Sequence, residues 1–208
     1  MITKFTENEF LDTLARIAHS HDRAACAQLR RSLSYEPGED TSIHRHLGHI
    51  ASGLGDAEQR AVYVVGGWYG LWRSKISGDT WAFDRYGGLT LGRALRRVMA
   101  RGNNAVKQSE ERRVARLLNL DSTGMETLVP QMIARIASVR GLHLDWGLLL
   151  RDVAQWGEGS SWVPPEAPPG WVHPSRRWAQ DFWSSSPITE KPNNVFTPSL
   201  EEQNGKVA

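Results

Sequence analysis

The chain has few of the features that mark secreted or membrane proteins. It contains a single cysteine, Cys26, which cannot form an internal disulfide. Its longest apolar run, residues 61–72, is twelve residues long and includes three glycines, well short of the roughly 20 residues of a membrane-spanning helix. The first ten residues lack the basic start and apolar core of a secretory signal. These absences predict a cytoplasmic protein without a membrane span.

Strand signals are also missing, because β-branched and aromatic residues nowhere alternate over five or more positions between turn residues. Apolar residues instead recur at helical spacing along most of the chain. Asp22, Asp56, Thr90 and Asp145 are expected to cap helices. We expect helices at about 5–17, from 22 to about 33, at 42–51, 56–72, 90–101 and 109–118, from 122 or 123 to 141, and at 145–156 and 175–184, with a loop at 77–88. The predicted fold class is all-α, a compact multi-helix bundle.

Composition changes after Gly157. Residues 158–208 hold eight of the ten prolines and four of the nine tryptophans. This density of proline excludes regular structure apart from the one short helix, whereas disordered tails are normally poor in aromatic residues. We therefore expect a helical domain at residues 1–157 and a Pro/Trp-rich extension at 158–208, packed either on that domain or on a partner.

Charge is unevenly distributed along the chain, although the net charge is only +2. Residues 85–116 hold nine basic and two acidic side chains, a local charge of +7, while the segments on both sides are mildly acidic. A basic block of this kind indicates a polyanion-binding site, and its alternative interpretation is a solvated helix face.

The basic block forms arginine faces on two of the expected helices. On a helical wheel, the arginines of residues 90–101 span an arc of about 140° opposite the apolar residues, and those of residues 109–118 span about 100°. If the helices pack through their apolar faces, their arginines can form one continuous surface. One of the two adjacent arginines at positions 30 and 31 could join this surface. The expected nucleic-acid-binding residues are Arg30, Arg31, Arg93, Arg96, Arg97, Arg101, Arg112, Arg113 and Arg116.

The residue types favour contacts to the phosphate backbone. A guanidinium donates two parallel hydrogen bonds to neighbouring phosphate oxygens and loses its hydration more readily than an ammonium group. No aromatic residues interleave with these arginines, so base stacking has little support there. We therefore expect binding without sequence preference. Pairing of some arginines with acids such as Glu110 and Glu111 is the structural alternative.

Enzyme signatures are weak. Of His44, His46 and His49, only the last two share a helical face, and no thiol or paired acid lies near them in the sequence. His21 and Asp22 resemble the HD pair of helical metal-dependent phosphohydrolases, but the upstream histidine of that family has no good match. The chain has no phosphate-binding P-loop, dinucleotide-binding motif or nucleophile elbow. We expect no catalytic residues, no metal site and no cofactor.

Four segments together resemble the CasB family, the small subunit of the type I-E CRISPR surveillance complex Cascade. They are CAQLRR at 26–31, LTLGRAL at 89–95, SEERRVARLL at 109–118 and LDWGLLLRDVAQWG at 144–157. The resemblance covers roughly residues 5–157, and we recognise no counterpart in the family for the loop at 74–88 or for the tail beyond Gly157. It supports the assignments of Arg30, Arg31, Arg93, Arg112 and Arg113, whereas those of Arg96, Arg97 and Arg101 rest on the helical wheel alone.

The resemblance implies an all-helical protein without catalytic activity. It further implies that the chain assembles as a pair along the guide-binding subunits, contacts guide RNA and target DNA, and stabilises the R-loop. Our hypothesis is thus a non-catalytic subunit that binds nucleic acid independently of sequence, with the other Cascade subunits and a second copy of itself as partners. The alternatives are a helix-turn-helix regulator using residues 90–118, an HD-like phosphohydrolase and a pure scaffold.

Overall fold

The computed structural model describes residues 2–76, 88–157, 163, 165, 167 and 169–184 of the chain. Over these residues it contains nine α-helices, one short 3-10 helix and no β-strand, apart from an isolated parallel bridge between Leu89 and Leu144. The predicted all-α fold class is confirmed. The helices are α1 (Lys4–His19), α2 (Arg23–Arg31), η1 (Ser32–Ser34), α3 (Thr41–Ala51), α4 (Asp56–Lys75), α5 (Leu91–Arg101), α6 (Asn104–Leu117), α7 (Ser122–Ala137), α8 (Trp146–Ala154) and α9 (Pro174–Trp183).

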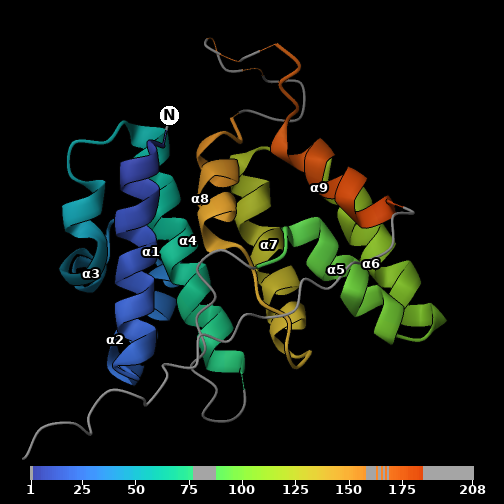
Figure 1. Cartoon of the computed structure of the whole chain (residues 1–208), viewed down its shortest axis with the longest axis horizontal. Coiled ribbons are helices and arrows are strands. Elements are labelled where there is room, and N and C mark those ends of the chain that lie inside the picture. Colours follow the sequence, from blue (N-terminus) through green and yellow to red (C-terminus); the bar gives the residue numbers. More distant parts are fainter. Residues whose placement is uncertain are drawn as a thin grey trace, which may run out of the picture.

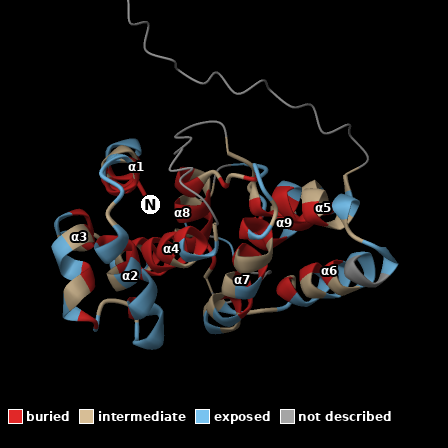
Figure 2. Cartoon of the chain, turned by 90° about the horizontal axis from the view of Figure 1, so that it is seen from below, coloured by how far each residue is buried: buried red, intermediate tan, exposed pale blue. Residues whose placement is uncertain are grey.

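Helix α4 occupies the centre of the molecule and contacts α2, α3, α7 and α8 (Figure 1). Helices α1, α2 and α3 lie on one side of it, and α5, α6 and α9 form the opposite end. All but one of residues 61–72 in α4 are buried (Figure 2). The most apolar segment of the sequence therefore forms the centre of the core, as we expected.

Glycines in α4 allow α2 to approach it closely. A Cβ atom on Gly70 would lie 2.6 Å from the backbone nitrogen of Arg30 and 2.7 Å from the carbonyl oxygen of Cys26, so only glycine fits at this crossing. The packing of backbone on backbone offsets the roughly 1 kcal/mol that a glycine costs inside a helix. Cys26 is buried, as its place on an apolar stripe predicts, and burial raises the pKa of its thiol to about 11.

Three predicted helix caps are confirmed, whereas the predicted cap Asp56 is the first residue of α4, whose cap is Gly55. The side chains of Asp22, Thr90 and Asp145 accept hydrogen bonds from the first turns of α2, α5 and α8. The cap of α7 was predicted at residue 122 or 123 and is instead Asp121, whose carboxylate accepts from the backbone N–H of Gly124 at 2.7 Å. Its carboxylate supplies this bond one residue before the predicted caps.

Helix α6 begins earlier than expected. It starts at Asn104, five residues before the predicted start at 109, because the backbone N–H of Lys107 already donates to the carbonyl of Asn103 at 3.0 Å. The apolar residues of this turn, Ala105 and Val106, are followed by no other apolar residue until Val114, so no apolar period marks the start of the helix. The expected loop at 77–88 lies outside the described residues, apart from position 88.

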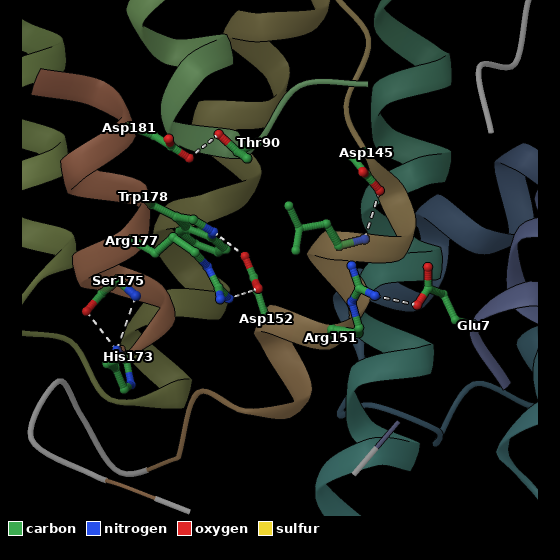
Figure 3. A network of polar contacts seen from close by, with 11 residues as sticks. Glu7, Thr90, Asp145, Arg151, Asp152, His173, Ser175, Arg177, Trp178 and Asp181 are labelled. Carbon is green, nitrogen blue, oxygen red and sulfur yellow. Dashed lines mark hydrogen bonds and ion pairs between the residues drawn. The ribbon is translucent and has the colours of Figure 1, made fainter. Parts of the chain in front are cut away.

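Helix α9 is anchored on α8 by buried polar groups (Figure 3). The carboxylate of Asp152 on α8 accepts hydrogen bonds from the guanidinium of Arg177 and, at 2.5 Å, from the indole of Trp178. Trp178 is fully buried, and its ring centroid lies 5.1 Å from that of Trp156. His173, the cap of α9, lies with Nε2 2.6 Å from the carbonyl oxygen of Trp156. The Pro/Trp-rich extension thus includes a helix that packs on the body, while a division of the chain at residue 157 stays a prediction.

Within the described ranges, no helix combines the length and the apolar character needed to cross a bilayer.

Candidate nucleic-acid interface

Most of the predicted arginines lie on two neighbouring helices. Helices α5 and α6 contact each other at one end of the molecule (Figures 1 and 2). Leu95 and Val98 of α5 and Val114 and Leu117 of α6 are buried, which confirms the apolar faces assigned on the helical wheel. The arginines on these two helices are Arg93, Arg96, Arg97, Arg101, Arg112, Arg113 and Arg116.

Helix α9 engages two arginines of α5. Nε of Arg93 donates to Oδ1 of Asp181 at 3.2 Å, and Nη1 of Arg96 donates to the carbonyl oxygen of Ser184 at 2.6 Å. Asp181 also accepts a hydrogen bond from the hydroxyl of Thr90 at 2.6 Å (Figure 3). Helix α9 therefore covers one edge of the arginine face that the wheel assigns to solvent.

The close approach of α9 depends on Gly92. A Cβ atom at this position would lie 2.0 Å from the carbonyl oxygen of Trp178 and 2.9 Å from Cβ of Asp181. A backbone oxygen cannot rotate out of the way as a side chain can. The sequence does not indicate these roles of Gly92 and Asp181, because no local pattern reports a contact between residues as far apart as Arg93 and Asp181, which are 88 positions apart.

A second arginine group contains a buried carboxylate. Glu110 of α6 is fully buried, and its Oε1 accepts from Nη1 of Arg113 at 2.9 Å and pairs with the guanidinium of Arg135 on α7. One negative charge is thus shared by two positive ones, so the group retains a net positive charge. For Arg113 the structural alternative, pairing with Glu110, is thus what the structure shows, and Arg135 is a further partner that the sequence did not indicate.

Four arginines of α5 and α6 have no carboxylate partner among the described residues, and we call them the cationic set. Nη1 of Arg101 donates to the carbonyl of Arg140 at 3.2 Å, and Nε of Arg112 donates to the carbonyl of Gln108 at 3.3 Å. A carbonyl is neutral, so these guanidinium groups keep their charge and further N–H donors. The side chains of Arg97 and Arg116 form no hydrogen bond or ion pair within the described ranges. The cationic set is Arg97, Arg101, Arg112 and Arg116.

The remaining two predicted arginines lie elsewhere. Arg30 and Arg31 end α2, which packs on α3 and α4 at the end of the molecule opposite α5 and α6 (Figures 1 and 2). Neither joins the surface of those two helices. Nε of Arg31 contacts Oδ2 of Asp40 at 3.3 Å, and the backbone N–H of Ser42 is the main cause of a lowered pKa of that carboxyl. Arg30 is exposed and has no such partner among the described residues.

The candidate metal ligands of the sequence are not brought together. The described residues contain no group of three or more histidine, cysteine or acidic side chains that could hold a metal ion. Nε2 of His44 lies 2.7 Å from the carbonyl of Gly38, whereas Nε2 of His46 lies 2.7 Å from the amide oxygen of Gln28. Asp22 caps α2, with Oδ1 accepting from the N–H of Ala25 at 2.8 Å.

Comparison with known proteins places these features in a family context. The family model described as CRISPR-associated protein Cse2 matches residues 25–183. The match extends through α9, which lies beyond the residues on which the sequence resemblance was based. No curated protein matches the chain significantly.

Several solved structures are similar to the chain. The Cse2-family protein TTHB189 of Thermus thermophilus is 26% identical with a TM-score of 0.62, and the match covers 85% of this chain and 97% of that one. CasB of M. ruber is 25% identical with a TM-score of 0.56, over 77% of this chain and 83% of that one. A chain of a CRISPR RNA-guided surveillance complex, pre-nicking, is 25% identical with a TM-score of 0.64, over 85% and 91% of the two chains.

Proposed function

The chain belongs to the Cse2 family of CRISPR-associated proteins, and from this premise we propose that it is a non-catalytic nucleic-acid-binding subunit of a Cascade surveillance complex. Similarity to a chain of a CRISPR RNA-guided surveillance complex supports assembly into such a complex. Its proposed partners are the other Cascade subunits, a second copy of itself, the guide RNA and the target DNA.

The cationic set is the observation that carries the binding role. Its four guanidinium groups lie on adjacent helices and lack carboxylate partners among the described residues, so they are available to phosphate oxygens. In an RNA-guided complex, base pairing reads the sequence and the protein holds the backbone. Because exchange of DNA pairing for RNA–DNA pairing is nearly balanced, contacts worth a few kcal/mol decide whether the R-loop persists.

A salt titration tests this role directly. Neutralisation of four phosphates on a single strand predicts that the logarithm of the affinity falls with the logarithm of salt concentration at a slope of about −2.8. Fluorescence anisotropy with two labelled single strands of unrelated sequence measures this slope and any sequence preference together. A flat titration would contradict the proposed role, and a strong preference for one duplex sequence would favour a helix-turn-helix regulator.

Two matched triple variants distinguish the contribution of the cationic set to binding from the effect of net charge alone. Replacement of Arg97, Arg112 and Arg116 with alanine should flatten the slope by about 2 and weaken binding to all sequences alike. The control replaces three exposed arginines on α1, α2 and α3, namely Arg16, Arg23 and Arg45, and changes the net charge equally. Equal losses in the two variants would show that the cationic set has no special part in binding.

Loss of function in the complex is the second test. A reconstituted Cascade carrying the first triple variant should form R-loops that dissociate faster than those of the control complex, with unchanged subunit composition.

Elemental analysis of the purified chain addresses the HD-like alternative, because stoichiometric bound metal would favour a phosphohydrolase.

A further inference from the structure

A small cavity lies outside the arginine surface, where the 3-10 turn η1 meets α4 and the first half of α7. Its volume is about 220 Å³. Pockets that bind cofactors or drug-sized ligands measure roughly 300–1,000 Å³, so this cavity is better matched to one long side chain. Its wall includes Leu33, Tyr35, Glu36, Arg60, Tyr63 and Glu126, none of which belongs to the cationic set.

The cavity carries an excess of negative charge. Nε and Nη2 of Arg60 donate to the two carboxylate oxygens of Glu126 at 2.6 and 2.7 Å, which is a bidentate pair that neutralises both groups. Oε2 of Glu36 lies 3.9 Å from Nη1 of Arg60, beyond hydrogen-bond distance, and this side chain is 73% exposed. Glu36 therefore makes only this longer ion pair with Arg60, and most of its side chain faces solvent, where a cation from outside can reach its oxygens.

Aromatic rings complete the wall. Tyr35 is 52% exposed, which is unusual for a large aromatic side chain, while Tyr63 and Trp68 are buried. An exposed aromatic face beside a carboxylate that only a 3.9 Å ion pair with Arg60 holds is the combination that recognises a guanidinium, which stacks on the ring and donates to the carboxylate.

The wall is also held in place before any partner binds. The hydroxyl of Tyr63 lies 2.9 Å from Nδ1 of His44. Gly38, at φ +91°, lies so close to the ring of Tyr63 that an added Cβ would be 3.0 Å from it. A pre-formed pocket lowers the ordering cost of binding.

We infer that this cavity receives an arginine side chain presented by a protein partner, with its guanidinium between the ring of Tyr35 and the carboxylate of Glu36. A nucleic-acid partner does not fit, because the charge excess of the cavity repels phosphate. Arginine is also among the residues that most often anchor protein interfaces. The identification of the partner as a neighbouring subunit rests on the proposed function. The inference that the pocket binds an arginine side chain rests only on the residues of its wall.

Titration of the isolated chain with N-acetyl-L-arginine methylamide tests the pocket by itself. We expect saturable NMR shifts of the Trp68 indole N–H and the Arg60 Nε–H, with a Kd of about 10 mM. The norleucine analogue, which has no charge, should give no saturable shift. Glu36→Gln should weaken binding of the arginine probe about tenfold, whereas Glu39→Gln, in the same turn but outside the wall, should leave it unchanged. Equal binding of both analogues, or equal effects of the two variants, would overturn the inference.

The assembled complex provides the second test. Replacement of Tyr35 with the photo-crosslinking residue p-benzoylphenylalanine should give, in reconstituted Cascade, a crosslink to a protein segment that contains an arginine, identified by mass spectrometry. Glu36→Arg should lower the affinity of the chain for the rest of the complex at least tenfold relative to Glu39→Arg. Crosslinks to nucleic acid alone, or equal affinities, would refute the docking role.

The two proposals can fail separately. If Glu36→Arg enters the complex normally while the triple variant of the cationic set loses nucleic-acid binding, only the docking inference fails. If the isolated chain binds the arginine probe at this pocket but shows no salt-dependent binding of nucleic acid, only the proposed function fails.

Discussion

The contact between α5 and α9 makes Gly92→Ala an informative substitution. The new Cβ atom would lie 2.0 Å from the carbonyl oxygen of Trp178 and 2.8 Å from its carbonyl carbon, although ordinary van der Waals contacts begin near 3.4 Å. Because the opposing atoms belong to the backbone, helix α9 must move by more than about 1 Å as a unit. That movement disturbs the hydrogen bonds that Asp181 forms with Thr90 and Arg93.

The expected magnitude is the difference of two opposing effects. Overpacking of a core contact costs about 1–3 kcal/mol, or more where the backbone must shift. Alanine favours the helix by about 1 kcal/mol relative to glycine. Because the opposing atoms are backbone, the upper part of the overpacking cost applies, about 2–3 kcal/mol. Gly92→Ala should therefore lower the free energy of unfolding by about 1–2 kcal/mol, with the loss concentrated in α9.

Urea denaturation and hydrogen exchange measure these two effects. Amide protection in α9 should fall more than protection in α4, because α9 loses its packing surface first. Gly48→Ala is the matched control, since its nearest neighbour is the side chain of His44 at 3.3 Å, and its stability should be equal or higher. If Gly92→Ala were as stable as the natural chain with α9 fully protected, the reasoning from this contact would be refuted.

Three further predictions concern charged groups near α9 and α6. Asp181→Asn should strengthen single-strand binding, measured by anisotropy, because it removes a negative charge and frees Arg93; unchanged affinity would count against a binding role for that arginine. Burial raises the pKa of Asp152 to about 6, against the lowering effect of the Arg177 guanidinium. The folded state then holds the proton longer than the unfolded state, so the stability from this group is complete below pH 3.8 and is lost as the pH rises through about 6, by about 3 kcal/mol. Urea curves of Asp152→Asn should lack this loss, and parallel pH profiles of the two proteins would contradict it. Glu110→Gln should lower stability by about 1–3 kcal/mol, since two guanidinium groups lose their shared carboxylate; an unchanged urea midpoint would show that the pair is not coupled to folding.

Local signals in the sequence were sufficient for the helices. Caps such as Asp22 and Asp145 act within their own first turn, and the apolar faces of α5 and α6 follow from a spacing of three and four residues. The start of α6 differs from the prediction because Ala105 and Val106 are followed by no other apolar residue until Val114, so no apolar period marks the first turn.

The arrangement of the candidate site depended on contacts between distant residues. The wheel identified the arginine face of α5, but the placement of α9 over Arg93 and Arg96 arises from Gly92 and Asp181, whose roles appear only once α9 is packed. Likewise, nothing near Arg30 in the sequence indicates that α2 lies at the opposite end from α6. Helix faces could be predicted from the sequence, whereas the relative positions of the helices could not.

The position of α9 has a practical consequence for work with shortened versions of this protein. A version that stops at residue 157 would lack Asp181 and the carbonyl of Ser184, and would present Arg93 and Arg96 without these partners. Such a protein would bind polyanions non-specifically with higher affinity, including heparin resins and contaminating cellular RNA. An increase in the apparent affinity for nucleic acid after truncation would then reflect the loss of an internal counter-charge. It should not be interpreted as the release of autoinhibition.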